Sequence, residues 1–401
     1  MTAITAPPAE DATLREVIGT LAPITREAGE PGEFEAATWI SERLRVAGAQ
    51  NVRIEEEQFR GGYPALHAKL AAIGVAAGAA GLVSRRMRIP AAAAGLAAGM
   101  AIADDCSNGI RVVRKVTQKP RTTWNVVAEA GDLAGAKTVV VCAHHDAAHG
   151  GKFFDQDLQH KLSERFPGIV ERIDTSLPTW WAPIGAPVLA ALGALRGSRK
   201  MMIGGAALSA FMTAAFADIA RSPIVPGAND NLSAVALLVA LAERLRERPV
   251  SGVRVLLASL GAEEILQGGV YGFMKRHGPE LDRATTHFMN FDTIGSPELI
   301  MLEGEGTTVM EDYFHRPFRD LVARAAERAD APLRRGLRSR NSTDAVIMSR
   351  AGYPTACFAS FDRYKELSNY HRMSDTAENV VYETVSHGVT VAEAAVRELA
   401  R

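Results

Sequence analysis

The sequence of 401 residues predicts an α/β fold, in which a mixed central sheet carries helices on both faces. Strand-like and helical segments alternate along most of the chain, as they do in such folds. The run at 137–143 is a continuous β-branched stretch, which is typical of a strand buried on both sides. Hydrophobic residues make up 47% of the chain, enough for a large core.

The predicted elements follow from apolar periodicity and turn residues. We expect strands over 51–58, 122–130, 137–143, 252–260, 285–292 and 354–360. We expect helices over 10–24, 33–47, 232–246, 268–277, 314–329, 343–351 and 380–400.

Two regions break this alternation with Ala/Gly-rich apolar runs. The runs occupy 70–83, 89–103, 180–195 and 201–217, and a short basic turn joins the members of each pair. Each pair resembles a helical hairpin. We therefore expect a single domain spanning 1–401 with two inserted hairpins, at 62–115 and 150–222, whose four helices form one bundle beside the active-site face.

The hairpins leave two interpretations open. A bilayer-spanning helix needs about 20 apolar residues, and each of these runs is somewhat shorter. Ala/Gly-rich helices pack closely in membranes, but they also form soluble bundles. Membrane association through 70–103 and 180–217 is the first expectation, and a soluble helical subdomain in a cytoplasmic protein is the alternative. The sequence also allows a homo-oligomer.

The N-terminal residues and the net charge bear on location and partners. Residues 1–17 lack a basic segment followed by an apolar one, so we expect no cleavable signal peptide. Basic residues in the hairpin turns favour the cytoplasmic side for the turns, which would require export of the first 69 residues. The formal net charge of −1 argues against nucleic acid as a partner.

Acidic and histidine residues stand at the ends of predicted strands. His144 and Asp146 follow the strand 137–143, and with a period of two they project to the same side. Asp292 ends the strand 285–292. Because open α/β sheets bind ligands beyond the carboxyl ends of their strands, these side chains are candidates for one site.

Three further segments contribute candidates. Asp230 lies in a Gly/Asn-rich turn before a helix, and His371 lies in a polar loop after Tyr370. Glu263 and Glu264 follow the strand 252–260 and point in different directions, so that one can bind a metal while the other faces a metal-bound water.

Taken together, these residues match the ligand set of a paired zinc site. Two imidazoles and three carboxylates are available as ligands, with one further carboxylate. Two Zn²⁺ ions are therefore the expected cofactors, although such ligands also accept other divalent ions. The further carboxylate is the candidate general base. Tyr370 is the candidate for stabilising the oxyanion.

The order of these motifs resembles the co-catalytic di-zinc aminopeptidases, the M28 peptidases. The shared motifs are His-x-Asp, Gly-x-x-Asp-Asn, Glu-Glu, Asp-x-x-Gly and Tyr-His, over roughly 1–60, 118–150 and 222–401. The resemblance implies a zinc aminopeptidase fold and a peptide substrate. It assigns His144 and Asp292 to one zinc ion, Glu264 and His371 to the other, and Asp230 to both. It further implies that Glu263 is the base and that Asp146 supports His144.

Some positions depart from the family pattern. Ser233-Ala234 replaces the usual Ser-Gly, and residues 342–347 replace Ser-Asp-His-x-x-Phe, a segment that lines the substrate side in relatives. Most relatives are aminopeptidases, so we expect an aminopeptidase that cleaves the N-terminal peptide bond. A glutaminyl cyclase-like acyltransferase and a non-catalytic membrane or interaction module are the alternatives.

Overall fold

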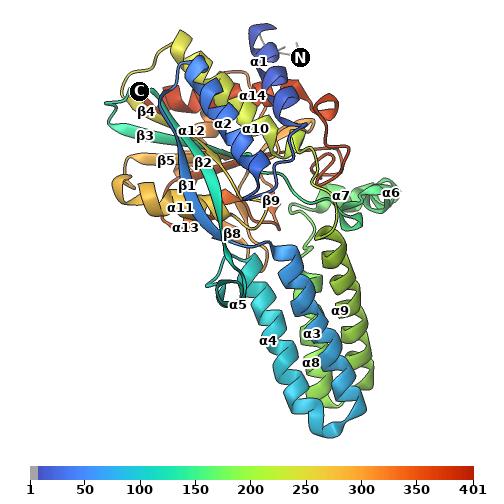
Figure 1. The fold of residues 1–401 in the computed structure, drawn as a ribbon. Helices are drawn as coiled ribbons and strands as arrows, with labels where there is room; N and C mark the ends of the chain where they lie inside the picture. Colours follow the sequence, from blue (N-terminus) through green and yellow to red (C-terminus); the bar gives the residue numbers. More distant parts are fainter. Residues whose placement is uncertain (1–7) are drawn as a thin grey trace.

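A seven-stranded mixed sheet forms the centre of the molecule in the computed structural model, which describes residues 8–401 (Figure 1). Residues 1–7, part of the predicted domain and of the segment inspected for a signal peptide, lie outside the described residues. In spatial order the strands are β1 (Gln50–Arg60), β2 (Pro120–Gly131), β4 (Val253–Leu260), β3 (Lys137–His144), β5 (Thr286–Phe291), β10 (Thr355–Phe361) and β6 (Glu298–Leu302).

The four central strands are parallel and the outer ones are not. β3 pairs in parallel with β4 and β5, and β5 with β10. β1, β2 and β6 join by antiparallel pairing. The carboxyl ends of β4, β3, β5 and β10 therefore meet at one edge of the sheet.

Helices cover both faces of this sheet, which confirms the predicted fold class. One face carries α1 (Pro8–Leu21), α2 (Pro31–Ala47), α10 (Ser233–Glu247), α12 (Arg316–Arg328) and α14 (Tyr382–Leu399). The other carries α11 (Gly268–His277) and α13 (Asp344–Arg350). Along β3, Val139 and Val141 pack on the first face, whereas Val140 and Cys142 pack on the second. This alternation explains why the whole run is apolar.

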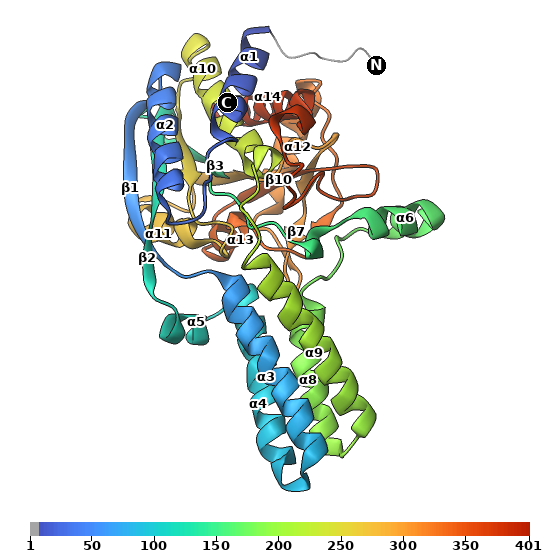
Figure 2. The same ribbon diagram turned by 45° about the vertical axis from the view of Figure 1, so that its right-hand side comes forward.

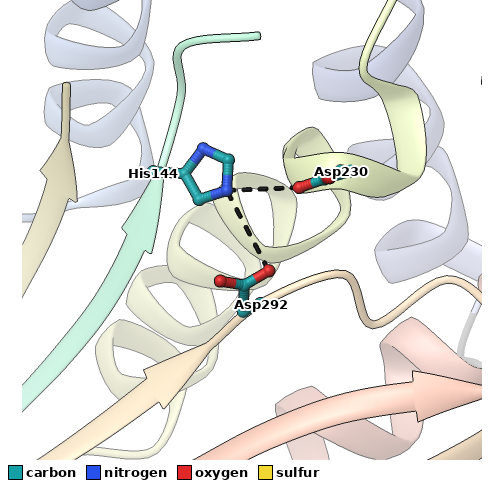
Figure 3. Close-up of side chains that lie close together, drawn as sticks. All are labelled: His144, Asp230 and Asp292. Carbon is teal, nitrogen blue, oxygen red and sulfur yellow. Dashed lines mark ion pairs between the residues drawn. The ribbon is translucent and has the colours of Figure 1, made fainter. Parts of the chain in front are cut away.

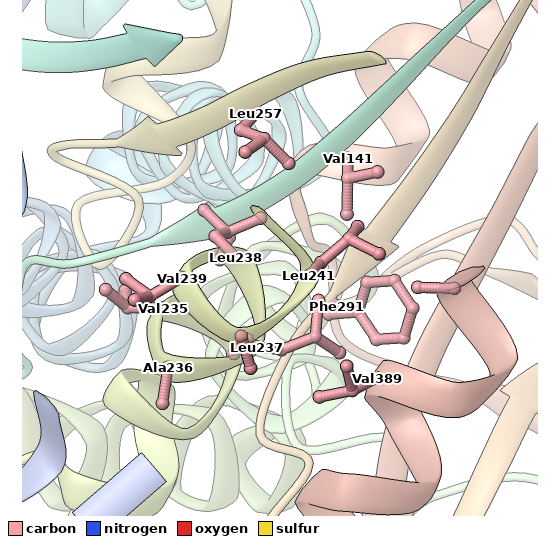
Figure 4. Packing of buried hydrophobic residues seen from close by; sticks show 14 of the residues in the cluster. Val141, Val235, Ala236, Leu237, Leu238, Val239, Leu241, Leu257, Phe291 and Val389 are labelled. Atoms are coloured by element: carbon pink, nitrogen blue, oxygen red, sulfur yellow. The ribbon is translucent and has the colours of Figure 1, made fainter. Parts of the chain in front are cut away.

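The core of the first face forms around α10. Leu238 and Leu241 of this helix lie near Val141 of β3 and Phe291 of β5 (Figure 4). Residues 233–242 are all buried, because α10 lies between the sheet and other helices. A helix enclosed in this way is apolar on every side. Its N-terminus, which follows the predicted turn with Asp230, is thus rigidly fixed at the carboxyl edge of the sheet.

Several short elements were not predicted. These are β6, a three-stranded sheet of β7 (Gly304–Glu305), β8 (Glu311–Asp312) and β9 (Arg338–Ser339), and the helices α5 (Val112–Thr117), α6 (Asp157–Arg165) and α7 (Pro167–Arg172). Two-residue strands and helices of two turns are too short to show a hydrophobic period.

A four-helix bundle projects from the α/β domain (Figures 1 and 2). It consists of α3 (Tyr63–Val83), α4 (Arg88–Cys106), α8 (Trp181–Arg196) and α9 (Arg199–Ile219), which pack against one another. Glycines allow close approach: a Cβ atom on Gly78 would lie 2.7 Å from the Cβ of Ala206, and one on Gly205 would lie 2.3 Å from the backbone nitrogen of Ala190. Such small-residue contacts are common in membrane bundles.

Three of the bundle helices, α3, α4 and α9, are longer than their apolar runs because flanking residues continue the helical turns, whereas α8 is as long as its run. The helical segments 63–83, 85–106 and 199–219 are long and apolar enough to cross a membrane, by length and composition only. The four helices fall within 62–115 and 150–222. We propose that both segments are insertions into one catalytic domain, since the sheet is assembled from strands on either side of each.

Candidate metal centre and active site

The candidate residues gather at the carboxyl edge of the parallel strands. His144 is the last residue of β3, and Asp292 directly follows β5. Glu263 and Glu264 follow β4, and His371 lies in the loop after β10. Asp230 reaches the same edge from the turn that precedes α10. Parallel strands that end side by side bring these distant segments together.

Two groups of three ligand atoms share Asp230. In the first group, His144 Nε2 lies 3.2 Å from Asp230 Oδ1 and 4.0 Å from Asp292 Oδ1 (Figure 3). In the second, His371 Nε2 lies 3.4 Å from Asp230 Oδ2 and 3.1 Å from Glu264 Oε2. The two oxygens of Asp230 thus face different histidines, which is the arrangement that a carboxylate bridging two metal ions requires.

The chemistry of this donor set fits divalent cations. Within the described chain, Glu264 Oε1 and both ring nitrogens of His371 are buried without a hydrogen-bond partner. Burial raises the pKa of Glu264 to about 7 and that of Asp292 to about 6. Packing these carboxylates together away from water is costly unless positive charge compensates it. Imidazole and carboxylate ligands in two such groups suit zinc.

Asp146 makes further contacts besides its predicted one with His144. Its carboxylate accepts hydrogen bonds from the backbone N–H groups of Glu263, at 2.9 Å, and Glu264, at 3.0 Å. His144 Nδ1 lies 3.5 Å from the carboxylate and 3.2 Å from the backbone oxygen of Asp146. Asp146 therefore fixes the turn that carries both glutamates as well as lying beside the histidine.

Glu263 is buried next to the two ligand groups. Its Oε1 accepts a hydrogen bond of 2.8 Å from the side-chain amide of Gln267, which also donates to the backbone oxygen of Ser342. Burial raises the pKa of Glu263 well above its usual range. The Gln267 amide holds one carboxylate oxygen in place and leaves the other free. Gln267 was not predicted, because it lies in an irregular turn four residues after Glu263.

The turn with Asp230 is held from two sides. The Asp375 carboxylate accepts hydrogen bonds from the backbone N–H groups of Asn229, at 2.7 Å, and Asp230, at 3.1 Å. The Asn231 side chain donates to the Phe291 oxygen at 3.0 Å and accepts from the Thr293 N–H at 2.9 Å. Asn231 thereby ties this turn to the segment that carries Asp292.

Tyr370 lies beside the second ligand group. Its ring stacks on that of His371, with centroids 3.9 Å apart and planes at 23°. Burial raises the pKa of Tyr370 well above its usual range, so the phenol keeps its proton and can donate a hydrogen bond. The edge of Phe154 approaches the same histidine, with centroids 4.5 Å apart. Both aromatic rings therefore pack against His371.

Arg26 is a buried structural residue that no sequence pattern predicted. Its guanidinium is fully buried between α1 and the metal-centre loops. It donates hydrogen bonds to five backbone carbonyls, those of Leu21, Ile24, His145, Pro226 and Gly227. Burial lowers its pKa to about 10, which leaves it charged at neutral pH. Arg26 therefore links the loop after His144 to the turn before Asp230.

Replacing Arg26 with methionine is expected to destabilise the fold by at least about 3 kcal/mol, since each buried carbonyl left without a donor costs about 1–3 kcal/mol. Urea unfolding followed by circular dichroism measures this change. The matched control is Arg15→Met, because Arg15 is exposed and makes only surface contacts, an ion pair with Asp11 and a cation–π contact with Tyr382. Equal stability of the two variants would contradict the role given to Arg26.

Comparisons with known proteins place part of the chain in a peptidase family model. Residues 205–396 match the model of peptidase family M28. The matched region contains Asp230, Glu263, Glu264, Asp292, Tyr370 and His371, and it begins after His144. None of the curated proteins that were compared matches the sequence.

Solved structures with the same fold include two aminopeptidases. The aminopeptidase from Aneurinibacillus sp. strain AM-1 is 14% identical, with a TM-score of 0.55 over 96% of this chain and 93% of that one. BSAP, a zinc aminopeptidase from Bacillus subtilis, is 14% identical, with a TM-score of 0.54 over 98% and 96%. A glutaminyl cyclase from Bacteroides thetaiotaomicron is 11% identical, with a TM-score of 0.55 over 98% and 99%.

The fold and the family match support a hydrolase of the metal-dependent peptidase type. The predicted resemblance to the M28 peptidases is confirmed by the family match together with these structural neighbours. At these low identities the structural likeness shows the fold alone, and it is shared by aminopeptidases and glutaminyl cyclases.

Proposed function

We propose that this chain is a di-zinc aminopeptidase that hydrolyses the N-terminal peptide bond of its substrates. The observation that carries the proposal is the pair of ligand groups that share Asp230, with Glu263 adjacent in sequence to the ligand Glu264. In the proposed site His144 and Asp292 would hold one zinc ion, Glu264 and His371 would hold the other, and Asp230 would contribute one carboxylate oxygen to each.

Zinc ions in this position supply a water of lowered pKa and polarise the scissile carbonyl. The Glu263 carboxylate accepts the proton of the attacking water and returns it to the nitrogen of the leaving amine. Its hydrogen bond with Gln267 orients the carboxylate for this transfer. The protonated phenol of Tyr370 donates a hydrogen bond to the oxyanion that develops on the carbonyl. Asp146 accepts hydrogen bonds from the backbone N–H groups of Glu263 and Glu264 and so fixes the position of both residues.

The proposal is tested by zinc analysis of the purified protein and a panel of aminoacyl para-nitroanilides and short peptides. An aminopeptidase releases para-nitroaniline and free N-terminal amino acids. A glutaminyl cyclase would instead release ammonia from N-terminal glutaminyl peptides and leave the peptide bond intact. Zinc-loaded protein that releases no amino acid from any member of the panel would refute the peptidase proposal.

We also propose that the four-helix bundle associates with a lipid bilayer. Its surface presents large apolar side chains to the surroundings, among them Val83, Ile89, Met100, Ile203 and Phe211. The runs 70–83, 89–103, 180–195 and 201–217 contain no charged residue. Exposed apolar area on this scale marks a partner or membrane surface.

The charges of the bundle lie at its ends, which favours a bilayer as the partner. The turns with Arg85, Arg86 and Arg88 and with Arg199 and Lys200 lie together at the end far from the sheet (Figure 2). Basic residues at a helix end can interact with lipid head groups.

Membranes from cells that express the chain provide the test of this association. We expect the protein to stay in the pellet after washing with alkaline carbonate, because the apolar surface of the bundle remains in lipid. Non-ionic detergent should release it. A peripheral and an integral marker protein from the same membranes serve as controls. Complete release by carbonate would contradict the membrane proposal and favour the soluble subdomain.

A further inference from the structure

A cavity of about 490 Å³ lies between the bundle and the candidate metal centre. Aromatic side chains line the part of the cavity between the bundle and the candidate metal centre, among them Tyr63, Phe154, Trp180, Phe216 and Tyr370. His371 lines the same part. Tyr370 and His371 also belong to the candidate active site, so the cavity reaches one of the proposed metal ligands, His371.

Both insertions build this cavity. Tyr63 begins α3 in the first insertion, whereas Trp180 and Phe216 come from the second. The ring centroid of Tyr63 lies 5.7 Å from that of Trp180 and 6.3 Å from that of Phe216, both edge to face. Residues of the two helical hairpins therefore form the wall that faces His371.

Phe154 connects the two parts of this wall. Its ring lies 4.5 Å from that of His371 and 5.8 Å from that of Tyr370, both edge to face. On the side away from the sheet, Phe154 packs with the cluster of Met212 and Phe216 in α9. An apolar group that lies along Phe154 would therefore reach from the metal ligands to the base of the bundle.

The volume is too large for a single amino-acid side chain. A cavity of about 150 Å³ already holds a benzene molecule. Pockets of about 300–1,000 Å³ hold drug-sized ligands. The cavity beside His371 therefore has room for an extended apolar chain.

The outer part of the same cavity remains apolar. Leu162, Phe166 and Leu177, which contribute to its lining, are each about half exposed. These side chains lie around α6 and α7 in the second insertion. An apolar chain can thus lie along α6 and α7 and extend from there to His371.

We propose that this cavity binds a long hydrocarbon chain carried by the substrate next to its scissile amide. The proposal rests on the proposed function and names the substrate class of that site: peptides or amides that bear an aliphatic chain longer than any common side chain. The chain lies along Phe154 toward Trp180 and Phe216, and the amide lies at His371.

A series of substrates with increasing chain length tests this binding. Para-nitroanilides of alanine and of 2-aminohexanoic, 2-aminooctanoic and 2-aminododecanoic acid place the chain on the acyl side. Alanyl amides of alkylamines of matching lengths place it on the leaving side. In one of the two series, kcat/KM should rise about threefold to fourfold for each added methylene group, the amount expected for burial of that group. No dependence on length in either series would overturn the proposal.

A pair of variants on α9 places the effect in the cavity. Ala215 lines the cavity, whereas the neighbouring Ala214 is exposed on the outside of the bundle. Ala215→Trp should abolish the gain from long chains but keep turnover of the alanine substrate, which shows that the variant is folded. Ala214→Trp should keep the gain. Equal behaviour of the two variants on long chains would contradict the assignment.

Direct binding separates this proposal from the proposed function. The fluorescent fatty acid dansylaminoundecanoic acid should bind the wild type and Ala214→Trp, and its affinity for Ala215→Trp should fall at least about tenfold. If the probe binds in this pattern but no amide is hydrolysed, the aminopeptidase proposal fails and the chain-binding cavity stands. If amides are hydrolysed but the probe binds all three proteins equally or not at all, the cavity proposal fails.

Discussion

Glu263→Gln is expected to lower kcat on a good anilide substrate by about a hundredfold to ten-thousandfold, the range found for removal of a positioned general base. Glutamine has nearly the same shape as glutamate, and its carbonyl oxygen can still accept the hydrogen bond from Gln267. It cannot accept the proton of the attacking water. The loss should therefore fall on kcat, while zinc content and the unfolding midpoint stay those of the wild type.

The control for this experiment is Glu129→Gln. Glu129 is a buried glutamate of β2, paired with Arg254 at the start of β4 and thus at the edge of the sheet opposite the site. This variant tests whether any change from glutamate to glutamine within the sheet lowers activity. Unchanged kcat in Glu263→Gln, with metal retained, would remove Glu263 from the mechanism.

Asp230→Ala is expected to have the second large effect, on metal content as well as on activity. Its two carboxylate oxygens lie near different histidines, at 3.2 Å from His144 and 3.4 Å from His371. Removing it therefore weakens both proposed zinc sites. We expect Asp230→Ala to hold less than about one zinc ion per chain and to be less active than Glu263→Gln.

The matched variant is Asp292→Ala, which removes a carboxylate from only one ligand group. It should retain about one zinc ion, held by Glu264, His371 and Asp230. Metal analysis by mass spectrometry after dialysis against zinc-free buffer distinguishes the two. Equal zinc loss in both variants would contradict the shared role of Asp230.

The clustering of the proposed ligands at one edge of the sheet could be predicted because of a simple geometric rule. His144, Glu264 and Asp292 each follow an apolar run, and the ends of parallel strands meet at one edge. The hydrogen bonds that hold these loops in place could not be predicted in this way. Arg26 follows α1 in a segment without period, and its partners are backbone carbonyls that no side-chain pattern reveals. The carboxylate of Asp146 bonds to backbone N–H groups for the same reason.

The bundle and the cavity show a second limit of the sequence. The apolar run at 70–83 underestimates the length of α3, because this helix begins at Tyr63, before the run starts at Leu70. The cavity depends on how two insertions far apart in the chain pack beside the loop with Tyr370. Tyr63 and Phe216 meet only through this tertiary packing, so neither is recognisable as part of a binding site from its neighbours in sequence.

The measurement that tests the central claim most directly is zinc titration of the metal-free protein, with bound zinc and anilide turnover followed in the same samples. Metal is first removed with a chelator, and circular dichroism verifies that the protein stays folded. We predict that turnover is absent without metal and reaches its plateau at about two zinc ions per chain, the number that two ligand groups sharing Asp230 can hold. Full turnover of the folded, metal-free protein, or a plateau reached at one ion per chain, would contradict the di-zinc mechanism.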